Sequence, residues 1–339
     1  MALGFNRRAV VSCATAAMLS GCGTSMPLTT APGEVPQDSI PTTASDRHDH
    51  NRSWMAPQAG IRDLVYVSND GGGNVFLYTY PAGMHVGTLF NLNSPAGLCT
   101  DASERVWVVE SGSSKILRFP HGERQATASL TNSAAQNLMA CAVDPTSGNL
   151  AATSLGTLSS AGAVWVYTNA SGKPKEYKNA QFAGFYFAAY DNQGNLYVDG
   201  IDNKYRFKLA ELPAGGASLN VISLNQTVGF PGGLQWDGQY LAVGDRKYQA
   251  KNDSAVYQIA ISGAQGSVVG TTTLSGSCDV VGFALVSAGQ KRRPSTNELV
   301  APDACQNNAR LYPYPGGGSS QKTLSGLQYP LAATISYAN

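Results

Sequence analysis

Carboxylates recur at one position of a repeated pattern, and they are the side chains in this chain best suited to chemistry. Each of them follows a short apolar segment: Asp70, Glu110, Asp199, Asp245 and Asp303. Two further residues, Asn137 and Asp279, come near the start of other apolar segments. Because Ca²⁺ takes about six to eight oxygen ligands, a ring of such side chains could hold this ion.

Hydrogen bonding to the backbone is the other role open to these carboxylates. Aspartates at turns commonly accept hydrogen bonds from neighbouring backbone amides. We expect this role to outweigh metal binding. The sequence therefore predicts no cofactor, with Ca²⁺ held by Asn137 and Asp279 as the alternative.

The elements that must position these residues are short strands that repeat along the chain. The clearest copies are LVYVSND (64–70), RVWVVES (105–111), NLAATSL (149–155), NLYVDGI (195–201), YLAVGDR (240–246) and ELVAPDA (298–304). A further strand follows each copy, and an inner-strand pattern such as PAGLCTD (95–101) or PGGLQWD (231–237) precedes most of them. A period of about 40 to 55 residues with no long helical pattern predicts an all-β fold.

Four short antiparallel strands per repeat are typical of a propeller blade. The first copy, at Leu64, lacks a preceding inner strand, whereas YPLAATIS (329–336) near the C-terminus has the inner-strand pattern. We therefore expect a six-bladed β-propeller over residues 58–339. Its ring should close where the C-terminal strand pairs with residues 64–68.

This pattern resembles the NHL and TolB-like six-bladed propellers. Their blades run as a Pro-x-Gly-Leu inner strand, an Asp turn, a Leu-Tyr-Val strand and a strand that ends near Gly. The resemblance covers residues 60–339 and implies the fold. It leaves the function open, because propellers serve as enzymes, receptors and scaffolds.

Gluconolactonase-like propellers share the six-bladed arrangement, which makes a metal-dependent lactonase the alternative function. That family has a metal-binding Asn within Pro-Asn-Gly at the head of an inner strand. This chain has Pro95-Ala96-Gly97 and Pro231-Gly232-Gly233 there, and their middle residues cannot bind a metal. Only Asn137 and Asp279 could take over the role.

The first 21 residues have the pattern of an export signal. Arg7 and Arg8 precede an apolar core that is too short to span a bilayer. Leu19-Ser20-Gly21-Cys22 resembles the bacterial lipobox, which implies that Cys22 is acylated, for example with palmitate, and becomes the mature N-terminus. Residues 22–57 are rich in Thr and Pro and predict a disordered tether that holds the folded part away from the membrane.

The four cysteines that follow the tether suggest disulfides, because they are even in number and the chain is expected to be exported. In the repeat register Cys278 begins an inner strand and Cys305 follows the end of the next strand, so we expect these two to be bonded. Cys99 and Cys141 lie on inner strands of neighbouring blades. They are either a second disulfide or buried free thiols.

The aromatic run GFYFAAY (184–190) is an inner strand, so most of its side chains should lie in the core. Tyr186 could instead reach the face that carries the carboxylates, beside Phe230 and Trp236, and stack on a sugar or a peptide. Loss of Arg7 and Arg8 leaves basic and acidic residues almost equal in number, so no nucleic-acid partner is expected.

These observations together predict an exported protein that is lipid-anchored to a bacterial membrane, on its periplasmic or cell-surface side. Its propeller would be a non-catalytic binding or scaffolding module for a protein, peptide or glycan. The expected binding face comprises Asp70, Glu110, Asn137, Tyr186, Asp199, Asp245, Asp279 and Asp303.

Overall fold

The computed structural model describes residues 52–248, 253–286 and 297–338. Predictions about the export signal, the acylated Cys22 and most of the tether lie outside these residues. Within the described part, no helix is both long enough and apolar enough to cross a membrane.

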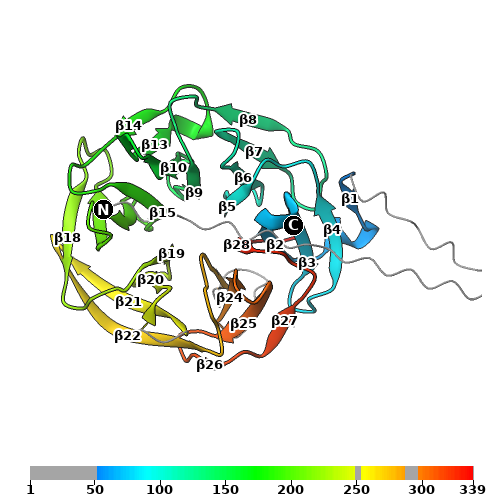
Figure 1. The fold of residues 1–339 in the computed structure, drawn as a ribbon. Helices are drawn as coiled ribbons and strands as arrows, with labels where there is room; N and C mark the ends of the chain where they lie inside the picture. The colour runs from blue at the N-terminus through cyan, green and yellow to red at the C-terminus, as the bar shows by residue number, and fades with distance from the viewer. Residues whose placement is uncertain (1–51, 249–252, 287–296, 339) are drawn as a thin grey trace, which may run out of the picture. The chain divides into compact units, whose positions relative to one another are not determined.

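The regular elements of the described residues are β-strands apart from a few short 3₁₀ helices, and the sheets stand in a ring around a central axis (Figure 1). One sheet has the order β1 (Trp54–Met55), β4 (His85–Leu89), β3 (Asn74–Thr79), β2 (Leu64–Asn69), β28 (Pro330–Ser336). The next has β5 (Pro95–Thr100), β6 (Val106–Glu110), β7 (Lys115–Phe119), β8 (Ala128–Thr131). A third has β9 (Leu138–Val143), β10 (Leu150–Ser154), β13 (Val164–Tyr167), β14 (Lys175–Tyr177).

A nine-stranded sheet continues the ring, and two four-stranded antiparallel halves make up most of it. One half is β15 (Gly184–Tyr190), β16 (Leu196–Ile201), β17 (Phe207–Leu212), β18 (Asn220–Leu224). The other is β19 (Pro231–Trp236), β20 (Leu241–Asp245), β21 (Ser254–Ser262), β22 (Gln265–Ser275), with β26 (Gly318–Ser319) beside β22. The halves join only through a short parallel pairing of Ser223–Leu224 with Gln265–Gly266.

A four-stranded sheet completes the ring, with the order β23 (Ala284–Val286), β24 (Glu298–Asp303), β25 (Asn308–Pro313), β27 (Lys322–Leu324). The remaining elements are a small hairpin and three short 3₁₀ helices: β11 (Gly156–Thr157), β12 (Ser160–Ala161), η1 (Pro57–Ile61), η2 (Asp70–Gly72) and η3 (Thr168–Ala170).

Strand β28 pairs antiparallel with β2, from Leu64 opposite Ser336 to Asn69 opposite Pro330. This confirms the predicted contact between the C-terminal strand and residues 64–68. The outermost strand of the same sheet, β1, pairs with β4 through Trp54 and Met55, so the sheet begins before the expected boundary at residue 58.

The second strands are apolar without alternation because both of their faces are buried between sheets. In β2, Leu64 and Tyr66 pack in a cluster with Val106 and Val108 of the next sheet. Val65 and Val67 point the other way, into a cluster with Val300 of the preceding sheet. Alternate side chains of one strand thus stabilise two sheet-to-sheet contacts.

The inner strands β5, β9, β15, β19 and β28 lie nearest the axis (Figure 1). They begin at one face of the ring, where the second strands end, and finish at the other. We call the face where they begin the upper face and the opposite one the lower face. Most of the predicted binding residues lie at strand ends of the upper face, whereas Tyr186 and Asp199 lie within β15 and β16.

Candidate binding face

Three of the predicted carboxylates occupy the same place in their sheets. Each ends a second strand opposite the first residue of the inner segment, in the pairs Glu110–Pro95, Asp245–Pro231 and Asp303–Val280. Each accepts a hydrogen bond from the backbone N–H two residues before its partner: Asn93 at 3.0 Å, Gly229 at 3.0 Å and Cys278 at 2.8 Å, respectively. These buried carboxylates therefore fasten the loops that lead into the inner strands.

Asp70 and Asp199 do not share that place. Asn69 occupies it in the first sheet, opposite Pro330, and its side-chain oxygen accepts a hydrogen bond from the N–H of Gln328. Asp70 is the next residue, in η2, where burial raises the pKa of its carboxyl and a hydrogen bond from Ser94 opposes that rise.

Asp199 lies within β16, opposite an irregularity in β15, and accepts a hydrogen bond from the N–H of Phe187 at 2.8 Å. Two other second-strand side chains act in the same way. Ser68 accepts a hydrogen bond from the N–H of Ala332 in β28, and Thr153 accepts one from the N–H of Ala140 in β9. The side chain of Asp199 is fully buried, and desolvation raises the pKa of its carboxyl well above the usual range. Its role is to satisfy a backbone amide of a bulged inner strand.

The two candidate calcium ligands have protein partners in the structure. Both carboxylate oxygens of Asp279 accept hydrogen bonds from the Arg246 guanidinium, at 2.7 and 2.8 Å. The side-chain amide of Asn137 donates to the carbonyl oxygen of Gly156 at 2.7 Å. A bidentate pair of this kind neutralises the carboxylate that a cation would need.

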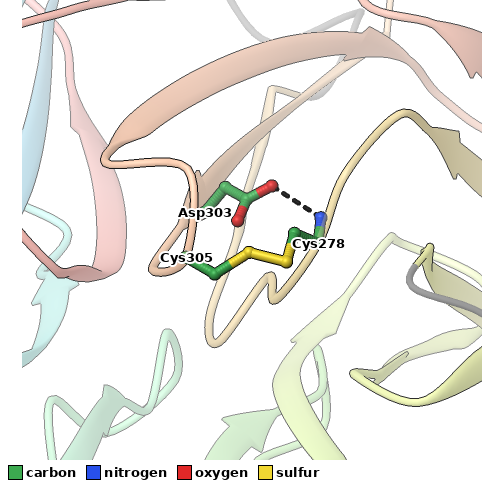
Figure 2. Close-up of side chains that lie close together, drawn as sticks. All are labelled: Cys278, Asp303 and Cys305. Atoms are coloured by element: carbon green, nitrogen blue, oxygen red, sulfur yellow. Dashed lines mark hydrogen bonds between the residues drawn. A yellow bond between two sulfur atoms is a disulfide. The ribbon is translucent and has the colours of Figure 1, made fainter.

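The expected Cys278–Cys305 pair is a disulfide, and so are Cys99 and Cys141, whose state the sequence left open. Cys99 and Cys141 link the neighbouring inner strands β5 and β9, with 5.7 Å between their Cα atoms. Cys278 and Cys305 are 5.9 Å apart by the same measure. Cys278, Cys305 and Asp303 also lie close enough together to suggest a metal site. Figure 2 shows instead that the two sulfurs are bonded to each other and that the Asp303 carboxylate accepts a hydrogen bond from the Cys278 N–H.

An aromatic and cationic cluster does form at the upper face, around Phe230. The ring of Tyr186 meets that of Phe230 edge-on, with centroids 5.5 Å apart. The Arg246 guanidinium lies 5.3 Å from the Phe230 centroid, and the Lys247 ammonium lies 5.1 Å from it. We call these four residues together with Asp279 the Phe230 patch.

Trp236 is not part of this patch, contrary to the expectation from the sequence. It ends β19, whereas Phe230 directly precedes that strand. At about 3.3 Å per residue, the six residues from Phe230 to Trp236 carry the chain roughly 20 Å towards the lower face. There the Trp236 ring stacks on Tyr197, with centroids 6.4 Å apart.

Two tyrosines that the sequence did not single out also project from the upper face. Tyr205 is 74% exposed, in the turn between β16 and β17, and Tyr329 is 49% exposed, directly before β28. Both have a left-handed backbone, with φ of 58° and 54°. Bulky residues rarely adopt this conformation, because their Cβ crowds the backbone.

The sequence did carry a signal for Tyr205. The turns at Asp191 and Asp202 have the same hydrogen bonds, in which the Asp carboxylate accepts from the N–H groups two and four residues later. The first turn places Gly194 at the left-handed position, and the second places Tyr205 there. Comparison of DNQGN with DNKYR would have shown a tyrosine where the turn favours glycine.

Comparisons with known proteins place the chain by its fold. No family model matches it, and no curated protein matches it either. A chain in the crystal structure of a nidogen/laminin complex is similar, with a TM-score of 0.63 and 13% identity over 82% of this chain and 99% of that one.

Two further solved structures are similar. Hydrazine synthase from Kuenenia stuttgartiensis has a TM-score of 0.56 and 15% identity over 78% of this chain and 83% of that one. A functionally unknown protein from Desulfotomaculum acetoxidans has a TM-score of 0.53 and 9% identity over 82% of this chain and 100% of that one. At such identities the likeness concerns the fold alone, and it shows that this chain folds as a β-propeller.

Proposed function

We propose that the protein is a lipid-anchored binding module of the bacterial envelope, whose upper face binds a protein or peptide partner. We count the ring as six blades, because the nine-stranded sheet divides into two four-stranded halves. The signal-like first 21 residues and Cys22 support export and anchoring. The two disulfides also support export, since such bonds persist in oxidising compartments.

The observation that carries the proposal is the pair of exposed tyrosines on left-handed backbone. A bulky residue in this conformation costs on the order of 1 kcal/mol more than glycine or asparagine would. The side chains of Tyr205 and Tyr329 do not recover that cost by burial, because they are 74% and 49% exposed. Aromatic side chains are enriched in the cores of protein interfaces. Burial of the two tyrosine rings against a partner would offset the cost of their backbone conformation.

The Phe230 patch supports the same face. Phe230 is half-buried with cations on its ring, and Lys247 is exposed beside it. The carboxylates that could have served catalysis hold loops instead, through Glu110, Asp245 and Asp303. The upper face therefore offers aromatic and cationic side chains for recognition. Its carboxylates hold the loops of that face in place.

The test is site-specific photo-crosslinking in cells that produce the protein. A photoreactive residue in place of Leu158, which is exposed in the β11–β12 turn of the upper face, should give one discrete adduct. The matched control is Met84, which is exposed on the lower face between β3 and β4. Equal adducts from both positions, or none from Leu158, would overturn the proposal.

Tyr205→Asn and Tyr329→Asn are expected to raise stability while they weaken binding. Each change relieves left-handed strain and should raise the free energy of unfolding by about 0.5 to 1 kcal/mol. The double variant should lose most of the Leu158 adduct. Urea unfolding measures the first effect and the crosslinked band the second. A stabilised double variant that still forms the adduct would remove the tyrosines from the interface.

Cys22→Ser is expected to abolish lipid attachment. Only the cysteine thiol can accept the diacylglycerol, so incorporation of a labelled fatty acid should fall to background and the protein should leave the membrane fraction. Cys13→Ser is the matched control and should still be labelled. Persistent labelling of the Cys22→Ser protein would contradict acylation at this residue.

A further inference from the structure

The ring axis holds a cavity of about 500 Å³ that the proposed function does not use. Inner strands β5, β9, β15, β19 and β28 line it, together with residues 282–285. At its upper end the inner strands approach one another at glycines. A Cβ on Gly233 would lie 2.9 Å from the backbone nitrogen of Phe283, and one on Gly282 would lie 3.0 Å from the carbonyl oxygen of Leu331.

The cavity extends to the loops of the lower face. Asp101, Glu104, Pro145 and Tyr337 line it, and all of them follow the ends of inner strands. Phe230, the centre of the Phe230 patch, directly precedes β19 and so lies at the opposite, upper face. The cavity is therefore separate from the proposed partner surface.

The charge of the lining disfavours anionic ligands. Asp101 and Glu104 are its acidic residues, and no Lys, Arg or His is among the described residues that line it. Both carboxylates also have protein partners. Asp101 accepts hydrogen bonds from Arg105 Nε at 2.8 Å and Trp107 Nε1 at 3.2 Å, and Glu104 accepts one from the Tyr337 N–H at 2.8 Å.

Neutral polar groups face the cavity from three inner strands. The hydroxyls of Thr100 and Thr334 lie 2.9 Å apart. The side-chain oxygen of Gln235 accepts a hydrogen bond from the Leu285 N–H at 2.6 Å, which fixes the orientation of its amide. Its Nε2 keeps two donors without a partner among the described residues.

Aromatic side chains complete the lining through Phe187, Tyr190 and Trp236. A cavity of about 300 to 1,000 Å³ with aromatic walls and a few oriented polar groups is typical of a small-molecule site. A sugar ring offers hydroxyls to groups such as Gln235 and apolar C–H faces to aromatic rings. We propose that this cavity binds a neutral sugar, either free or as the end of a glycan.

The first experiment is calorimetric titration and saturation-transfer NMR on the propeller with four neutral sugars: glucose, galactose, mannose and N-acetylglucosamine. At least one should bind saturably, whereas glucuronate and glucose 6-phosphate should not bind. An oligosaccharide that ends in the sugar found to bind distinguishes the two sources. If the ligand is a glycan end, the oligosaccharide should bind at least as tightly as the free sugar; if the ligand is a free sugar, it should bind more weakly. Failure of every neutral sugar, or equal binding of the anionic ones, would overturn the proposal.

The second experiment uses Gln235→Glu, which keeps the acceptor for the Leu285 N–H but removes the amide donors and adds a negative charge. The dissociation constant should rise about tenfold or more. Thr334→Val, which loses only a hydroxyl, should weaken binding several-fold and remains informative if Gln235→Glu does not fold.

Val269→Thr on the exposed face of β22 is the matched control and should leave sugar binding unchanged. Unchanged affinity in both cavity variants would place the sugar elsewhere. Loss of sugar binding should leave the Leu158 adduct intact, so this inference and the proposed function can fail separately.

Discussion

Removal of the Cys99–Cys141 disulfide by Cys99→Ala and Cys141→Ala is expected to lower the free energy of unfolding by about 4 kcal/mol. The bond closes a loop of 42 residues, and the chain-entropy cost of opening such a loop in the unfolded state sets this magnitude. Because the bond joins β5 to β9, its loss also removes the covalent link between two neighbouring inner strands. The urea midpoint of the purified protein measures the effect.

Loss of the second disulfide, through Cys278→Ala and Cys305→Ala, should cost slightly less, about 3.5 kcal/mol, because its residues are 27 apart in sequence. Treatment of the unaltered protein with a reductant should reproduce the sum of both losses. A change below about 1 kcal/mol in either pair variant would mean that the bond contributes little beyond the surrounding packing.

Asp245→Ala is expected to destabilise the protein by about 2 to 4 kcal/mol and to disrupt the Phe230 patch. The buried carboxylate accepts hydrogen bonds from the N–H groups of Gly229, Phe230 and Lys247, and alanine leaves these donors without an acceptor. Since two of the donors belong to patch residues, the Leu158 adduct should also weaken. Thermal unfolding and the crosslinked band measure the two effects.

Asp70→Ala is the matched control, because it removes a half-buried upper-face carboxylate that does not end a second strand. It should cost less than about 1 kcal/mol. Asp245→Asn keeps one oxygen acceptor and should fall between the two. If Asp70→Ala and Asp245→Ala lower the free energy of unfolding equally, the position of Asp245 at the end of a second strand has no special role in stability.

The strand repeats and the closure of the ring could be predicted because a strand buried on both faces has a continuous run of apolar residues. LVYV in β2 is continuously apolar since its alternate side chains serve two different clusters. The first repeat lacks an inner strand, and YPLAATIS near the C-terminus has the inner-strand pattern without a repeat of its own. The C-terminal segment was therefore the expected partner of β2. The disulfide between Cys278 and Cys305 followed from the same register, which places their strand ends together.

The exact register of the carboxylates could not be predicted, because bulges shift it. The β5–β6, β15–β16, β19–β20 and β2–β28 pairings each contain an irregularity, and one extra residue exchanges the inward and outward side chains. Asp199 thus satisfies a bulge amide like Ser68, although it looks like an equivalent of Asp245 in the sequence. Likewise, Asn69 and not Asp70 fastens the loop before β28.

The sequence by itself determined the strands, their repeat, the pairing of the ends and the Cys278–Cys305 cross-link, since each depends on local periodicity. Only the tertiary structure decided that Asp279 pairs with Arg246, that Trp236 lies far from Phe230, and that Tyr205 and Tyr329 stand exposed. It alone also showed the axial cavity, because the cavity is formed by side chains from inner strands far apart in the chain. Such contacts depend on three-dimensional packing, which no short stretch of sequence encodes.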